Sequence, residues 1–225
     1  FSNLNATEVD CRNFALGELP PDIRKFTRLT TLRCTDNGLT ELPAALGELT
    51  HLRELYCSVN QLTALPAEMA KLTQLRELYC DNNQLTRLPA WVGQLTNLQE
   101  LYCHKNRLVE LPAELGQLDP TLRRFNCGDN FLEVLPLELQ HLVNLESNEF
   151  CKFTGNPLLS PPLAVAEQGP RAVVAYLRDL SSQGSGVLQQ ARVILVGYGG
   201  VGKSTTLRAL MLPESGGEDG DSPSA

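Results

Sequence analysis

The chain has 225 residues, of which 42% are hydrophobic, 20% charged and 6% aromatic. These proportions exclude a disordered polyampholyte, a collagen and a membrane-embedded bundle, and no apolar run approaches the roughly 18 residues of a spanning helix. The 19 Lys and Arg against 26 Asp and Glu give a net charge of −7, which disfavours a nucleic-acid or anionic-membrane surface as the main function. The chain starts with Phe1 and shows no secretory signal, so we expect the natural chain to start upstream.

The cysteines recur at a fixed period. Five of them lie 23 residues apart and a sixth follows after 24, namely Cys11, Cys34, Cys57, Cys80, Cys103 and Cys127. The extra residue falls around 119–121, and prolines from Pro20 to Pro136 keep the same register. A period of this length indicates a repeat protein. Close cysteine pairs, which metal sites use, do not occur among the repeated cysteines.

Each repeat has the pattern Leu-x-x-Leu-x-Cys-x-x-Asn-x-Leu-x-x-Leu-Pro, which is typical of a leucine-rich repeat. Leu55 and Cys57 are two residues apart, so they point to the same side of an extended segment. A single repeat cannot bury its leucines, and stacked repeats place their strands in one parallel sheet. We therefore predict an α/β fold class, a leucine-rich-repeat solenoid with a parallel β-sheet horseshoe of about seven repeats over residues 1–162.

The remaining positions of the repeat predict how one coil joins the next. An asparagine follows each strand, and its buried amide is expected to bond backbone groups of adjacent coils. These residues are Asn37, Asn60, Asn83, Asn106 and Asn130. The Leu-Pro pair leads into a return segment such as 67–72, where we expect short helices or 3₁₀ turns that pack Met69 and Leu72 on the rear of the sheet.

The repeated cysteines occupy a core position and are interpreted as buried free thiols. Equivalent atoms of stacked strands cannot all pair into disulfides, and free thiols are typical of a reducing compartment, so we predict a cytoplasmic protein. Cys151 is out of register, because the run 156–158 marks the last turn and places Phe153 at the usual cysteine position. The final repeat is therefore expected to be distorted.

Outward side chains of successive strands form columns on the predicted concave face. The columns contain Tyr56, Tyr79 and Tyr102, then Glu54, Glu77 and Glu100 with Arg53 and Arg76 beside them, and His104 at the edge. We predict that these residues bind a protein partner, because tyrosine is enriched in interfaces. A Ras-type GTPase and a kinase are the candidate partners. The alternative is an aromatic ladder that only stabilises the sheet, which recent duplication would also produce.

After the repeats the composition changes. The proline-rich run 156–162 ends the solenoid. Residues 163–180 are predicted to form a helix that caps the last coil, with an interruption at 169–170 and the proline suited to a first helical turn. Residues 181–190 have linker composition, and residues 213–225 are predicted to be an acidic, disordered tail.

The segment 191–212 has the order strand, glycine-rich loop and helix that a phosphate-binding loop needs. Backbone N–H groups of such a loop converge on phosphate oxygens, and the helix start adds positive charge. The residues predicted to contact a nucleotide are Gly197, Gly199, Gly200, Val201, Gly202, Lys203, Ser204 and Thr205. The Ser204 hydroxyl is the predicted ligand of Mg²⁺. A chance match to the loop pattern is the alternative.

The loop resembles that of Ras-type small GTPases, from which only Tyr198 departs. The repeats resemble the intracellular leucine-rich repeats of the Ras-associated group, whose arrays often end in Asn-Pro-Leu, Pro-Pro, a glycine and a Tyr-Leu helix. Here these are 156–158, 161–162, Gly169 and 176–177. Joined in this order, the pieces resemble the Roco family, in which such repeats precede a Ras-like GTPase domain, a dimerising region and frequently a kinase. The resemblance implies GTP or GDP with Mg²⁺ as cofactors of the intact parent, and a role of the repeats in recruitment or regulation of signalling.

Only 13 residues follow Leu212, and they contain neither the Mg²⁺-ordering Asp, the switch segments nor the Asn-Lys-x-Asp of a complete Ras-like domain. We therefore expect that this chain alone neither binds nucleotide tightly nor hydrolyses it. Two other hypotheses stay open. One is a non-enzymatic scaffold whose repeats bind a signalling protein and whose P-loop is non-functional. The other is an ATPase, because such a loop recognises phosphates and not the base.

Overall fold

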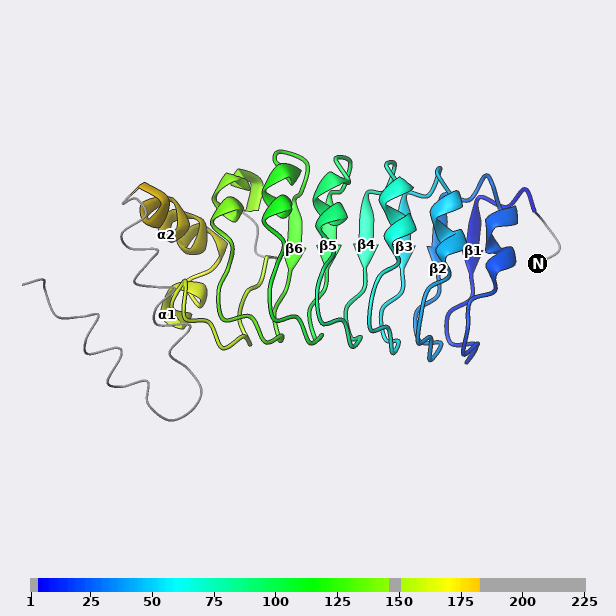
Figure 1. Cartoon of the computed structure of the whole chain (residues 1–225), viewed down its shortest axis with the longest axis horizontal. Coiled ribbons are helices and arrows are strands. Elements are labelled where there is room, and N and C mark those ends of the chain that lie inside the picture. The colour runs from blue at the N-terminus through cyan, green and yellow to red at the C-terminus, as the bar shows by residue number, and fades with distance from the viewer. Residues whose placement is uncertain (1–3, 146–150, 183–225) are drawn as a thin grey trace, which may run out of the picture. The chain divides into compact units, whose positions relative to one another are not determined.

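The structure is a computed structural model that describes residues 4–145 and 151–182. These residues belong to one compact unit, Phe1–Ser182. The predicted phosphate-loop segment 191–212, the acidic tail 213–225 and most of the predicted linker lie outside the described residues. Within the unit the chain runs in successive coils, each with a short strand on one side and a short helix on the other (Figure 1).

In the described residues, six short strands form one parallel sheet in chain order. The strands are β1 (Glu8–Asp10), β2 (Thr31–Arg33), β3 (Glu54–Tyr56), β4 (Glu77–Tyr79), β5 (Glu100–Tyr102) and β6 (Arg124–Asn126). The middle residue of β3 and β4 is a buried leucine, and its two neighbours are half-buried. Equivalent residues of successive repeats pair in register, as Leu55 does with Leu78. The predicted parallel sheet of a leucine-rich-repeat fold is confirmed.

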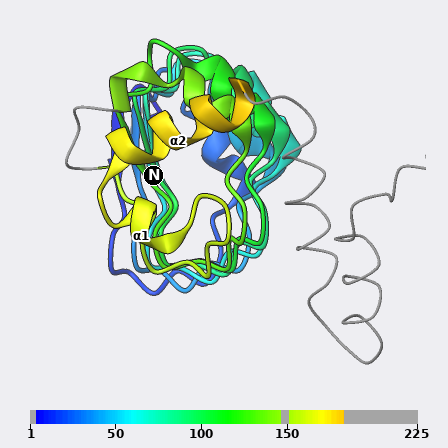
Figure 2. The same ribbon diagram turned by 90° about the vertical axis from the view of Figure 1, so that its left-hand side faces the viewer.

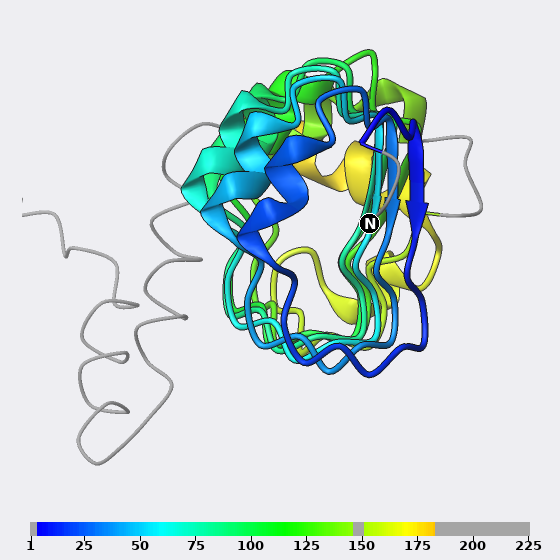
Figure 3. The same ribbon diagram turned by 90° about the vertical axis from the view of Figure 1, so that its right-hand side faces the viewer.

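Most of the return segments form 3₁₀ helices. They are η1 (Pro21–Lys25), η2 (Ala44–Glu48), η3 (Ala67–Lys71), η4 (Ala90–Gln94), η5 (Ala113–Leu118), η6 (Leu137–His141) and η7 (Val143–Leu145). A proline with extended backbone precedes η1 to η6 and turns the chain into the helix. Met69 and Leu72 are fully buried, so the prediction for 67–72 is confirmed. Figures 2 and 3 look along the stack from its two ends and show strands and helices on different sides of the coils.

The space between the sheet and the helices is filled by leucines and by the column of cysteines. All seven cysteines are buried and free, as predicted for the thiols. The Cys57 thiol donates to the carbonyl oxygen of Tyr79 in the next coil, at 3.3 Å. Burial raises the pKa of Cys34 to about 12, and it raises the pKa of Cys57 well above the usual value of 9.0. These thiols are therefore protonated and unreactive in the folded chain at neutral pH.

We expect the free energy of unfolding to fall as the pH rises above about 9. Thiols of the unfolded chain ionise near 9.0, whereas burial keeps Cys57, Cys80 and Cys103 protonated in the folded state. The unfolded state then binds fewer protons, so each such thiol lowers the free energy of unfolding by about 1.4 kcal/mol per pH unit. Urea unfolding at neutral and at alkaline pH measures this slope. The Cys80→Ala variant should show a shallower slope, and a wild-type stability that is equal at both pH values would contradict the prediction.

Buried asparagines join each coil to its neighbours. The Nδ2 of Asn60 donates to the carbonyl oxygens of Cys34 and Cys57, at 3.1 and 3.0 Å. Its Oδ1 accepts the backbone N–H of Leu39 at 3.0 Å. The same pattern recurs at Asn37, Asn83, Asn106, Asn130 and Asn156. The asparagine ladder predicted from the repeat is confirmed.

The last coil is irregular, as the broken period predicts. Asn156 still takes the asparagine position and accepts the backbone N–H of Leu132 at 3.1 Å. Phe153 stands at the cysteine position, and its ring packs edge to face on Phe125 with centroids 5.9 Å apart. Cys151 is buried one core position earlier. The last coil therefore fills the same interior position, with a phenylalanine where the other coils have a cysteine.

The interrupted helix predicted over 163–180 is two helices in the structure, α1 (Leu163–Ala166) and α2 (Pro170–Ser182). They are separated at Gly169, whose φ of +95° is a left-handed conformation that glycine adopts readily. α2 extends two residues into the predicted linker 181–190 and packs against η6. Its buried residues are Val173, Val174, Leu177 and Leu180. Among the described helices, none is both long and apolar enough to cross a membrane.

Candidate protein-binding face

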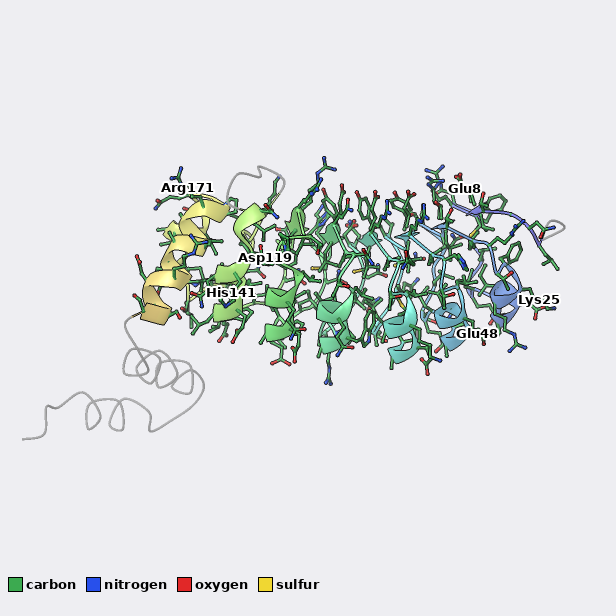
Figure 4. The ribbon with its side chains drawn as sticks, turned by 90° about the horizontal axis from the view of Figure 1, so that it is seen from above. Glu8, Lys25, Glu48, Asp119, His141 and Arg171 are labelled. Atoms are coloured by element: carbon green, nitrogen blue, oxygen red, sulfur yellow. The ribbon has the colours of Figure 1, made fainter. Side chains whose placement is uncertain are left out.

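The predicted glutamates and tyrosines lie on the outward surface of strands β3 to β5, Arg53 and Arg76 directly precede β3 and β4, and His104 follows β5. We call the outward surface of strands β1 to β6 with these adjoining residues the sheet face. Alternation along each strand turns Leu55 inward and leaves Glu54 and Tyr56 on the outward side. Because the strands pair in register, equivalent residues of neighbouring repeats lie side by side and form columns. In Figure 4, Glu8 lies on the side of the sheet, and Glu48 lies on the opposite side with the 3₁₀ helices.

The tyrosine column consists of Tyr56, Tyr79 and Tyr102. Ring centroids of the first pair are 4.8 Å apart and those of the second pair 4.5 Å apart, in edge-to-face arrangements. The Arg33 guanidinium carbon lies 5.3 Å from the centroid of the Tyr56 ring. Contacts of this kind stabilise a sheet by about 1 kcal/mol per pair. The aromatic ladder is present, and because the rings are only half-buried they also leave surface for a partner.

Hydrogen bonds to the neighbouring carboxylate column hold two of the rings in place. The Tyr56 hydroxyl donates to Glu77, and the Tyr79 hydroxyl donates to Glu100, both at 2.6 Å. Burial, together with these bonds to carboxylates, raises the pKa of Tyr56 and of Tyr79 above the usual value. Both phenols are therefore hydrogen-bond donors at neutral pH.

Two arginines flank these columns, with Arg33 in register with Tyr56 and Arg124 in register with Glu100. Arg33 pairs with Glu8, and its Nη2 lies 3.8 Å from Glu54. Arg124 Nη1 lies 2.6 Å from Glu100. The sequence prediction did not include Arg124, although it occupies the glutamate position of the repeat that follows Glu100. Arg124 is found at this position when the 24-residue repeat is aligned with the 23-residue repeats.

The edge of the sheet face has a second polar group around Asp81. Ser58 Oγ donates to Asp81 Oδ1 at 2.6 Å, and His104 Nε2 lies 3.8 Å from Asp81 Oδ2. Arg53 and Arg76 are exposed beside the carboxylate column and form no ion pair within the described residues. In the part of the chain that the structure describes, no group of three or more His, Cys, Asp or Glu is placed to hold a metal ion.

The predicted nucleotide-binding residues lie outside the described residues. They are Gly197, Gly199, Gly200, Val201, Gly202, Lys203, Ser204 and Thr205, with Ser204 as the predicted Mg²⁺ ligand. Their role stays a prediction from the sequence.

Comparison with known proteins identifies the repeats. The family described as leucine-rich repeats in two copies matches residues 27–70 and 73–116. No curated protein matches the chain. Among solved structures, a leucine-rich-repeat protein of Leptospira interrogans is 33% identical, with a TM-score of 0.56, and the match covers 60% of this chain and 35% of that protein.

Two other solved structures are similar over a larger share of this chain. A functional domain of InlJ from Listeria monocytogenes, described as including a cysteine ladder, is 30% identical with a TM-score of 0.55 and 68% of this chain covered. The ectodomain of the plant receptor kinase GASSHO1/SCHENGEN3 from Arabidopsis thaliana, in complex with CASPARIAN STRIP INTEGRITY FACTOR 2, is 28% identical with a TM-score of 0.57 and 63% covered. These matches cover 30% and 17% of the two chains, so this chain spans about a third or less of the length of the proteins that it matches. The chain therefore contains leucine-rich repeats, and its described part has the leucine-rich-repeat fold.

Proposed function

We propose that this chain binds a partner polypeptide on the sheet face, around the tyrosine column. The observation that carries the proposal is the arrangement of Tyr56, Tyr79 and Tyr102, whose rings contact one another beside Glu77 and Glu100. Aromatic rings that are already ordered lose little conformational entropy in a complex, and tyrosine is frequent among residues that dominate binding energy. The ladder that stabilises the sheet is thus also suited to binding.

The comparisons support this proposal at the level of the fold. One of the similar structures is a receptor ectodomain in complex with CASPARIAN STRIP INTEGRITY FACTOR 2, and it is 28% identical to this chain. The identity of a partner for this chain is part of the proposal, with a Ras-type GTPase and a kinase as the candidates that the family resemblance suggests.

We expect Tyr79→Ala to weaken binding of a sheet-face partner by about 30-fold, because it removes the central ring of the column. Tyr79→Phe keeps the ring and should retain most of the affinity. Both are measured by titration calorimetry with a partner that the wild-type chain pulls down. Lys71→Ala, on the helix side of the preceding repeat, is the control and should bind like the wild type. If Tyr79→Ala binds with unchanged affinity and has a native circular-dichroism spectrum, the column only stabilises the sheet.

We further propose that the parent protein binds GTP with Mg²⁺ through the loop 197–204. This second candidate is supported by the sequence Gly-Tyr-Gly-Gly-Val-Gly-Lys-Ser between an apolar β-branched run and a helix-compatible segment. Because this loop follows leucine-rich repeats, we propose that the parent protein is a Roco-type signalling GTPase. A scaffold with a non-functional P-loop and an ATPase are the alternatives.

For the 225-residue chain alone we expect no tight binding of Mg²⁺-GTP in a calorimetric titration, because the base-reading segment of a GTPase is not in this sequence. Micromolar affinity that Lys203→Ala abolishes would contradict this expectation. The gene sequence downstream distinguishes the three hypotheses for the parent. Asn-Lys-x-Asp with Asp-x-x-Gly supports a GTPase, an arginine-rich sensor region supports an ATPase, and an early stop codon supports the scaffold.

Two further parts of the proposal concern the setting of the repeats. We propose that α1 and α2 cap the C-terminal end of the array, since α2 buries four apolar side chains and packs against η6. We also propose a cytoplasmic location, which the seven free thiols support because a reducing compartment keeps thiols free.

A further inference from the structure

The outward positions at the centre of the sheet face are mainly polar and acidic, with the exposed Arg53 and Arg76 beside them at the start of β3 and β4. The outward positions of the three central repeats are Glu54, Tyr56, Ser58, Glu77, Tyr79, Asp81, Glu100, Tyr102 and His104. Four of these nine side chains are carboxylates, and none is a lysine or an arginine. A partner that covers these positions binds better if it supplies positive charge, because burying unpaired carboxylates opposes binding.

The chain itself shows how an arginine fits a carboxylate of this column. Arg33 lies over the ring of Tyr56, with its guanidinium carbon 5.3 Å from the centroid and its Nη2 3.8 Å from Glu54. At the other end of the column, Arg124 lies 2.6 Å from Glu100. A planar guanidinium suits the first place because it lies over an aromatic ring beside a carboxylate, and it suits the second because it donates a hydrogen bond to a carboxylate.

Glu77 lies between these two places and has no such partner. Its carboxylate accepts one neutral hydrogen bond, from the Tyr56 hydroxyl, and it forms no ion pair within the described residues. It pairs in register with Glu54 on one side and Glu100 on the other. Like charges in adjacent strands repel, so a cation bound at the middle carboxylate would relieve a repulsion that the free protein bears. Glu77 is also half-buried, so water screens its charge less than that of an exposed residue.

We propose that the partner contributes an arginine side chain that pairs with Glu77, in the way that Arg33 pairs with Glu54 and Arg124 with Glu100. The guanidinium lies next to Tyr56 and Tyr79, and the other carboxylates of the face attract positive charge around it. The partner is thus a polypeptide whose contact segment is basic. This inference rests on the proposed function, since it names the chemistry of the partner for the same face.

The test uses peptides selected from a random phage-displayed library on the immobilised 225-residue chain. Peptides that bind the wild type and not Tyr79→Ala are taken as sheet-face ligands, and we expect arginine to be enriched in them. One such peptide is synthesised with arginine and with citrulline, which has nearly the same shape and no charge. On the wild type, the arginine form should bind about tenfold more tightly than the citrulline form. On Glu77→Gln, which keeps the acceptor for Tyr56, this preference should fall to about twofold or less.

The control is Glu68→Gln, which changes an exposed carboxylate of the preceding repeat on η3, away from the sheet face. It should keep the tenfold preference for arginine. If sheet-face peptides contain no enriched arginine, or if Glu77→Gln keeps the full preference, the inference is wrong while the proposed binding face stands. If no selected peptide loses binding to a folded Tyr79→Ala variant, the proposed function itself is wrong, and the inference with it.

Discussion

Replacing Asn83 by alanine is expected to lower the free energy of unfolding by about 4 kcal/mol, which would be a large share of the stability of a small domain. Asn83 Nδ2 donates to the carbonyl oxygens of Cys57 and Cys80, at 3.1 and 3.0 Å, and its Oδ1 accepts the N–H of Leu62 at 3.0 Å. Asn83 is 8% exposed, so water has little access to replace these bonds. Each buried backbone group left without a partner costs about 1 to 3 kcal/mol.

Urea unfolding of the wild type and the variant, followed by circular dichroism, measures this difference. The matched control is Asn97→Ala, since Asn97 makes a single exposed bond to the carbonyl oxygen of Thr73. We expect the control to change stability by about 0.5 kcal/mol or less. Asn83→Asp separates the two halves of the amide, because it keeps an acceptor for Leu62 but places a carboxylate against two carbonyl oxygens. A stability of Asn83→Ala equal to that of the control would show that the ladder contributes little.

Replacing Gly93 by alanine is expected to destabilise the fold by about 2 to 3 kcal/mol. This is the opposite of the usual effect in a helix, where alanine is more favourable than glycine. A Cβ atom at Gly93 would overlap the backbone carbonyl group of Glu114, where η4 packs against η5. The glycine at the same place in η2, Gly47, faces the carbonyl of Glu68 in the same way. A backbone group cannot rotate away as a flexible side chain does, so neighbouring coils must move apart.

The equivalent position in η3 is Ala70, and η3 packs less extensively on η4 than η2 packs on η3 or η4 on η5. Where this position is alanine, as in η3, the 3₁₀ helix of the next coil therefore packs less closely. Thermal unfolding of Gly93→Ala measures the cost, and Ala90→Ser is the control, because Ala90 is exposed in the same 3₁₀ helix. A melting temperature of Gly93→Ala equal to that of the control would contradict the steric argument.

Much of the fold follows from one repeated pattern of residues. The interval between Cys57 and Cys80 predicts the coil, and the alternation around Leu55 predicts which residues form the interior. The asparagine that follows each strand predicts the hydrogen bonds between coils. These features are predictable because each depends on residues that are close in the chain or separated by one constant period.

The positions of the columns in the candidate site are predictable for the same reason. The repeat pattern does not reveal which of their charged side chains pair with one another. Tyr56 and Glu77 are 21 residues apart, and their hydrogen bond depends on how one coil sits on the next. Arg124 and Glu100 are 24 residues apart instead of 23, because the repeat between them has one additional residue. Identical glutamates therefore have different surroundings, and Glu77 is set apart only when the side chains of three coils are seen together.

The same distinction applies to the ends and the rear of the array. The residues of 163–180 predict both a helix and its interruption at 169–170, because glycine and proline act locally, but the packing of α2 on η6 depends on contacts with the preceding coil. The need for glycine at Gly93 arises from a carbonyl group 21 residues later. A periodic pattern records which side of a coil a residue occupies, whereas the distance between two coils results from all the side chains packed between them, and no short stretch of sequence contains that information.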